Sequence, residues 1–185
     1  MNIRNNTRII TINALLLAIG AILHQITPAL GLPMQPDFAL TMLFIIIILN
    51  NNFKITMISG TLMGVFTAMT TKFPGGQLPN IIDKFFTAFI VFMFIALIKK
   101  SNILGRLSLE KRKNVLMTII LPLGTLISGF LFLGSAQIIV GLPANFSILF
   151  LTVVAPAIAL NTVLGLVLYR VIESALRRAS YSIRK

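Results

Sequence analysis

Long apolar runs, separated by short polar and basic segments, dominate this chain. Six stretches consist almost entirely of hydrophobic residues, at 9–29, 38–49, 55–71, 80–98, 115–140 and 146–169. A helix needs about 20 mostly apolar residues to cross a hydrocarbon core about 30 Å thick. The pattern therefore predicts an all-α integral membrane protein, a compact bundle of six transmembrane helices that forms one domain over residues 1–185.

The second run, 38–49, is the short one. It is too short to cross a bilayer without tilt or local thinning, and it could instead be a buried or re-entrant segment. We count it as a span because only an even number of crossings places both basic ends of the chain on one side of the membrane.

The basic residues predict the orientation of the bundle. With the N-terminus inside, the cytoplasmic segments include a loop at 99–114 and a basic tail at 170–185. They hold every lysine and arginine except Lys72 and Lys84, which leaves fourteen of the sixteen inside. Such an excess follows the positive-inside rule, so we expect a multi-pass protein of the plasma membrane with both termini in the cytoplasm.

Composition narrows the classes of function. Hydrophobic residues make up 57% of the chain, mean hydropathy is +0.96, and only 11% of residues are charged, against about 25% in soluble domains. The net charge of +12 lies in loops and tails rather than on one face of a domain, which argues against nucleic-acid binding. The absence of cysteine and the single histidine exclude thiolate and multi-histidine metal sites, so we expect no bound metal or cofactor.

The outer connection between the third and fourth runs, TTKFPGGQLPNIIDK at 70–84, is the richest in candidate chemistry. Its glycines let the backbone approach a ligand, its amides can donate and accept, and Asp83 and Lys84 offer one charge of each sign, as a zwitterion requires. Asp37 lies at the outer start of the second run, where a carboxylate is costly and therefore a functional candidate. The predicted substrate-binding residues are Asp37, Lys72, Gly75, Gly76, Gln77, Asn80, Asp83, Lys84 and Asn161.

A structural alternative accounts for the same residues. Asn80 would cap the fourth helix, Asp83 would sit in its first turn, and Lys84 would extend toward the interface. Further polar residues in or beside the apolar runs could line an outward-facing pocket or form only interhelical hydrogen bonds. They are His24, Gln25, Gln137, Asn145 and Asn161.

Small residues recur at helical spacing in two of the runs. Ala14 and Ala18 lie on one face of the first run, and Gly60 and Gly64 on one face of the third. Such faces allow close approach of another helix, either within the bundle or on a partner protein.

Motifs for energy conversion and hydrolysis are absent. The sequence contains no GxxxxGK[ST] and no HExxH, and its Gly134-Ser135 pair lacks the GxSxG frame. The chain is therefore not expected to be an enzyme or to hydrolyse ATP.

The strings FPGGQLPNIIDK and MQPDFALTMLF, together with the spacing of the runs, resemble the bacterial tryptophan transporter family, TrpP. That family in turn resembles the substrate-binding S components of energy-coupling factor (ECF) transporters. The resemblance implies tryptophan as the ligand, and as partners an ECF coupling membrane subunit and two ATPase subunits that would use ATP. It also implies that Ala14 and Ala18 dock the coupling subunit.

Three hypotheses follow. The first is an S component for tryptophan, with Asp37 or Asp83 pairing with the ammonium and with Lys84, Asn80 and Gln77 holding the carboxylate. The second is a stand-alone secondary transporter for tryptophan or another small aromatic or zwitterionic solute, driven by protons or sodium through Asp83. The third is a membrane protein with a structural role and no ligand.

Overall fold

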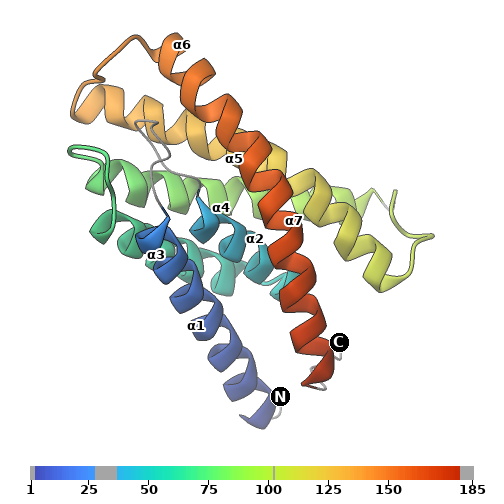
Figure 1. Ribbon diagram of the computed structural model, residues 1–185. Helices are drawn as coiled ribbons and strands as arrows, with labels where there is room; N and C mark the ends of the chain where they lie inside the picture. Colours follow the sequence, from blue (N-terminus) through green and yellow to red (C-terminus); the bar gives the residue numbers. More distant parts are fainter. Residues whose placement is uncertain (1–2, 28–36, 102, 180–185) are drawn as a thin grey trace.

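The computed structural model describes residues 3–27, 37–101 and 103–179, and all secondary structure within them is helical (Figure 1). The helices are α1 (Ile3–Ile26), α2 (Phe38–Asn50), α3 (Phe53–Met69), α4 (Gln77–Lys100), α5 (Leu109–Ile139), α6 (Phe146–Leu149), the π-helix η1 (Phe150–Val154) and α7 (Ala155–Arg178). The ends of the predicted first span at 28–29 and of the basic tail at 180–185 lie outside the described residues.

Four helical stretches of the described chain are long and apolar enough to cross a membrane. They are Asn6–Ile26, Gln77–Lys100, Leu109–Ile139 and Phe146–Arg178. The helices α2 and α3 are apolar but have only 13 and 17 residues. The all-α prediction is confirmed, and crossing by six helices remains a prediction.

Helix α2 lies at the centre of the bundle. Each residue from 39 to 48 exposes 4% or less of its surface, and α2 contacts α1, α3, α4, α5 and α7. The sequence of α2 is apolar around its whole circumference, which is typical of a helix buried on all sides. Asp37 caps its start by accepting a hydrogen bond from the backbone N–H of Leu40 at 3.0 Å.

Two glycines bring α3 and α4 into close contact. A Cβ on Gly60 would lie 2.7 Å from Cβ of Ala88, and a Cβ on Gly64 would lie 3.0 Å from Cα of Ile81. The small-residue face of the third run therefore packs inside the bundle. The other such face remains open, because Ala14 and Ala18 of α1 are both exposed.

The last helical stretch of the bundle contains a π-helical turn near its start. The helices α6, η1 and α7 form one continuous stretch, and Pro156 stands in the first turn of α7. Proline lacks the N–H that would complete an ordinary α-helical ladder. A π-helical turn of this kind often occurs beside a functional site.

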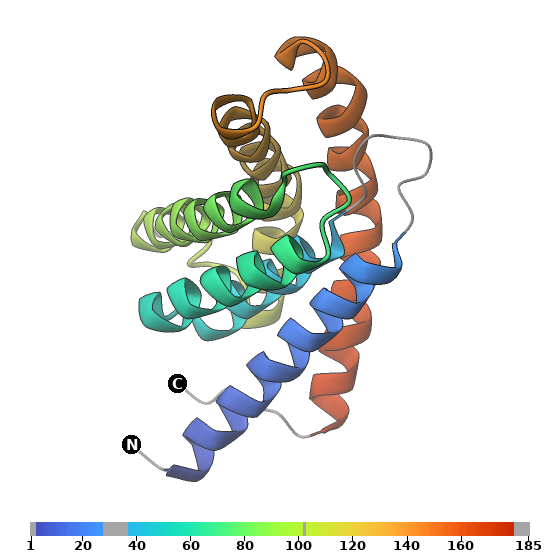
Figure 2. The same ribbon diagram turned by 90° about the vertical axis from the view of Figure 1, so that its left-hand side faces the viewer.

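The start of α1 and the end of α7 lie at the same end of the molecule, as both ribbon views show (Figure 1, Figure 2). The guanidinium of Arg8 donates a 2.7 Å hydrogen bond to the carbonyl of Ala179, which joins the start of α1 to the end of α7. Helices α1, α5 and α7 extend furthest beyond the predicted spans, and α1 begins at Ile3. The first residue of α5 is Leu109, after the N-cap Ser108, and α7 continues to Arg178.

Candidate functional site

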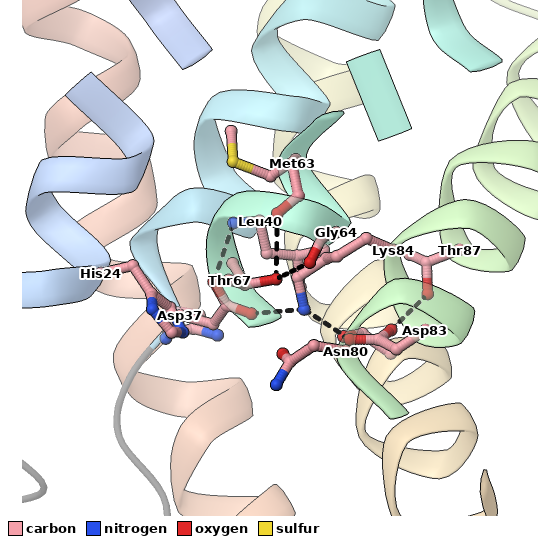
Figure 3. A network of polar contacts seen from close by, with 12 residues as sticks. His24, Asp37, Leu40, Met63, Gly64, Thr67, Asn80, Asp83, Lys84 and Thr87 are labelled. Atoms are coloured by element: carbon pink, nitrogen blue, oxygen red, sulfur yellow. Dashed lines mark hydrogen bonds and ion pairs between the residues drawn. The ribbon is translucent and has the colours of Figure 1, made fainter. Parts of the chain in front are cut away.

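Three charged side chains form a buried cluster at the N-terminal end of α2. The ammonium of Lys84 lies 2.6 Å from Oδ2 of Asp37 and is also paired with Oδ2 of Asp83. Lys84 and Asp83 each expose only 1% of their surface, whereas the side chain of Asp37 exposes 18%. Figure 3 shows the lysine nitrogen between the two carboxylates. We call Asp37, Lys84 and Asp83 the charge triad.

The carboxylate of Asp83 is fully engaged by donors. Its Oδ1 accepts a hydrogen bond from Thr87 at 2.9 Å, and its Oδ2 accepts one from Ser128 at 2.9 Å in addition to the contact with Lys84. Asp37 is more open. Its Oδ1 caps α2 and its backbone N–H donates to Asn161 Oδ1 at 3.0 Å, so the carboxylate is fixed but keeps an accessible side.

The charge triad has a formal net charge of −1, because one ammonium faces two carboxylates. A charge removed from water is costly unless it is paired and hydrogen-bonded. Asp37 is the more exposed of the two carboxylates and lines a cavity, so it is the member of the triad that a ligand ammonium could reach.

The cavity beside the charge triad contains about 780 Å³ of empty space, counting the part that is open to solvent. Its wall combines one polar side with a larger apolar side that includes Phe73 and Phe132, whose rings meet edge-to-face at 5.4 Å. The lining residues are His24, Asp37, Leu40, Thr71, Lys72, Phe73, Asn80, Asp83, Lys84, Thr125, Ser128, Gly129, Phe132, Val153, Val154, Ala157, Leu160 and Asn161.

Two further basic side chains lie at the cavity. Lys72 donates a 2.5 Å hydrogen bond to the carbonyl of Thr27, which ties the connection between α3 and α4 to the end of α1. His24 of α1 is buried, and its Nδ1 lies 2.7 Å from Oγ1 of Thr70. The polar part of the cavity lining therefore includes residues of α1 and of the connection between α3 and α4.

Six of the nine predicted substrate-binding residues line the cavity, namely Asp37, Lys72, Asn80, Asp83, Lys84 and Asn161. Gly75, Gly76 and Gln77 do not line it. Gly75 has φ +71° and packs against Val140, and the N–H of Gly76 closes a turn by donating to the carbonyl of Phe73 at 2.9 Å. The two glycines therefore shape the turn, and Gln77 is the first, exposed residue of α4.

The sequence also allowed a purely structural role for Asn80 as the cap of the fourth helix, and the structure does not support that role. Asn80 is not the cap of α4, which begins three residues earlier, and its Nδ2 donates to the carbonyl of Gly76 at 2.8 Å. Among the other polar candidates, Asn161 and His24 line the cavity, whereas Gln25, Gln137 and Asn145 are exposed.

Sequence reasoning missed the wall that α5 supplies. Thr125, Ser128, Gly129 and Phe132 follow the i, i+3, i+4, i+7 spacing of one helix face, and all four line the cavity. The available signal was this stripe of two hydroxyls and a glycine within an otherwise apolar run. Val153 and Val154 of η1 also line the cavity, and Val154 packs against Gly129 of α5.

Comparison with known proteins supports the identity of the chain. Residues 6–177 match the family described as tryptophan transporter TrpP. A probable tryptophan transport protein of Clostridium perfringens is 82% identical, with 97% of this chain and 99% of the relative aligned. Proteins of the same description from Clostridium acetobutylicum and Bacillus subtilis are 45% and 41% identical, over 94% and 95% of this chain and 96% of each relative.

No solved structure matches the chain significantly. The family match nevertheless covers nearly the full length, and it includes both the charge triad and the α5 wall. This chain belongs to the TrpP family of tryptophan transporters.

Proposed function

We propose that this protein captures tryptophan in the cavity beside the charge triad and acts as the substrate-binding S component of an ECF transporter. The observation that carries the proposal is the partly exposed carboxylate of Asp37 beside a largely apolar wall in one cavity. An aromatic amino acid offers the complementary groups, an ammonium and a planar ring.

As a family member with four membrane-spanning helices, the chain is a multi-pass protein of the bacterial cell membrane. We further propose that α2 and α3 complete six crossings, with both termini in the cytoplasm. The proximity of Arg8 to Ala179 supports an even number of crossings, since it brings the two chain ends together. The distribution of fourteen of the sixteen basic residues supports the cytoplasmic side.

The geometry suggests which groups contact which part of the ligand. Asp37 rather than Asp83 would receive the ammonium, because Asp83 is sealed by Lys84, Thr87 and Ser128. Lys84 is already held between two carboxylates, so Lys72 is the better placed cation for the ligand carboxylate. A lysine ammonium has three donors, and Lys72 uses one of them on Thr27.

The energy for uptake would come from other subunits. The sequence has no phosphate-binding loop, so ATP would be hydrolysed by two partner ATPases joined through a coupling membrane subunit. The exposed face of α1 with Ala14 and Ala18 offers the coupling subunit a surface for close helix contact. No catalysis is proposed for this chain.

The direct test is saturable tryptophan binding by the purified protein in detergent, with Asp37→Asn as the variant. Asparagine also caps helices well, so the change removes the charge and retains the start of α2. Losing a buried charge pair costs about 2–5 kcal/mol, so the affinity should fall at least about 30-fold. Glu110→Gln changes an exposed carboxylate at the other end of α5 and should bind as the unaltered protein does.

A saturable isotherm with another solute and none with tryptophan would refute the assignment of the substrate. Equal affinity of Asp37→Asn and the unaltered protein would refute the role of Asp37.

The second candidate is an ion-coupled secondary transporter, which the excess negative charge of the triad also favours, since a sodium ion or proton could neutralise it. Reconstitution of this chain alone in liposomes separates the two. Tryptophan accumulation driven by an imposed ion gradient, with no ATPase present, would favour the secondary transporter.

A further inference from the structure

One hydroxyl on the cavity wall has no hydrogen-bond partner. Three residues with hydroxyl groups line the cavity, namely Thr71, Thr125 and Ser128. Thr71 accepts a hydrogen bond from the N–H of Phe73 at 3.3 Å, and Ser128 donates to Asp83 at 2.9 Å. Thr125 exposes only 4% of its surface, and its Oγ1 is buried without a hydrogen-bond partner among the described residues.

A buried hydroxyl without a partner is unfavourable, by an amount comparable to a lost hydrogen bond. Threonine in a helix often avoids this cost by donating to the carbonyl one turn earlier. Thr67 does so in this protein, with Oγ1 donating to the carbonyl of Met63 at 2.9 Å. Thr125 makes no such bond. Its oxygen is itself buried, but the residue lines the cavity, so a molecule that reached the oxygen from there would supply the missing partner.

The position of Thr125 is at the inner part of the α5 wall. It precedes Ser128 by three residues, which is about 4.5 Å along the helix axis, and Ser128 is bonded to the charge triad. A ligand whose ammonium contacts Asp37 could therefore direct its ring toward Thr125, which lies on the opposite side of Ser128 from Phe132 along α5.

Building on the proposed function, we propose that the hydroxyl of Thr125 accepts the indole N–H of bound tryptophan and sets the preference for indole over rings that lack this donor. Indole nitrogen can only donate, and when buried it usually finds an acceptor. A hydroxyl can accept in either χ1 rotamer that threonine adopts in helices. The apolar remainder of the wall favours an aromatic ring, and the hydrogen bond to Thr125 favours indole over aromatic rings without an N–H.

The experiment compares two ligands on two proteins. The ligands are tryptophan and its isostere 3-(benzothiophen-3-yl)alanine, in which sulfur replaces the N–H. The proteins are the full-length chain and Thr125→Val, with affinities measured by titration calorimetry in detergent. The unaltered protein should bind tryptophan about tenfold more tightly than the isostere. Thr125→Val should lose that factor for tryptophan and leave the affinity for the isostere unchanged.

A matched control is available in α2. Thr41 also has a buried hydroxyl without a partner and is exposed by only 1%, but it does not line the cavity. Thr41→Val should therefore retain the preference for tryptophan, and Thr125→Ser should retain it because the hydroxyl remains.

The outcomes separate this inference from the proposed function. Equal affinities of the unaltered protein for tryptophan and the isostere would overturn the role of Thr125, without recourse to any variant. An equal loss for both ligands in Thr125→Val would do the same and leave tryptophan binding in place. Absence of saturable tryptophan binding to the unaltered protein would overturn both proposals.

Discussion

At the residue scale, the charge triad is the feature with the largest energetic consequence. Its single ammonium serves two carboxylates, one sealed and one partly open. Replacing one member of a buried ion pair costs about 3–5 kcal/mol when a charge is left unpaired. The effect of a substitution should therefore depend on the charge that remains rather than on the contact that is lost.

Lys84→Met should lower the free energy of unfolding by about 3–5 kcal/mol, because it leaves two buried carboxylates without a cation. Adding Asp83→Asn should recover part of this loss, since it removes the sealed carboxylate and leaves only the partly exposed Asp37 charged. Chemical unfolding of the purified variants in detergent measures both effects. A double variant less stable than Lys84→Met alone would contradict the proposed charge balance.

The residue scale also shows what the sequence could predict about the site. Asp83, Lys84 and Asn80 stand out as polar residues at the start of an apolar run, and Asp37 stands out for the same reason. The triad itself was not predictable. Neighbours at i and i+1 do not usually face each other on a helix, and the third member comes from a segment 47 residues away from Lys84 in sequence.

At the element scale, helix packing through glycine holds the polar wall of α4 in place. Gly64 of α3 lies against the backbone of Ile81 and Asn80, and Asn80 lines the cavity. Because these neighbours are backbone atoms, an added methyl group would force the two helices apart rather than turn a side chain.

Gly64→Ala should therefore destabilise the protein by about 1–3 kcal/mol, the cost of overpacking a close contact. Gly134→Ala is the matched control, because a Cβ at Gly134 of α5 meets no atom within 4 Å. That change should be neutral or stabilise by up to about 1 kcal/mol through helix propensity. Thermal unfolding of the two single variants tests the contrast, which would be absent if the α3–α4 contact were loose.

The positions of the helices were easier to predict than the sides of them that line the cavity. Each of the six apolar runs corresponds to a helix, because lipid or protein burial requires a helix wherever the backbone must satisfy its own hydrogen bonds. The ends moved where charged residues continue a helix beyond its apolar part, as at Glu110 in α5. The inward face of α5 was marked in the sequence only by two hydroxyls and a glycine, because in an apolar helix the surrounding helices decide which side meets the cavity.

At the scale of the whole molecule, the proposed orientation can be tested with cysteine, since the natural sequence has none. Lys111→Cys lies in the exposed first turns of α5, and Asn145→Cys lies in the exposed connection before α6. A membrane-impermeant maleimide should label Asn145→Cys in intact cells and Lys111→Cys only after permeabilisation. The reverse pattern would place the termini outside, and labelling of both in intact cells would contradict an intervening span.

The central position of α2 has a consequence for how the protein responds to its ligand. The residue that would receive the ammonium is the cap of the one helix that touches α1, α3, α4, α5 and α7. Ligand binding at that carboxylate would therefore stabilise a helix that packs against five others. We expect amide hydrogen exchange to slow on ligand binding in helices remote from the ligand as well as in those beside it. On the proposed orientation, this effect would carry ligand binding to the cytoplasmic ends of the helices, where partner subunits would detect it.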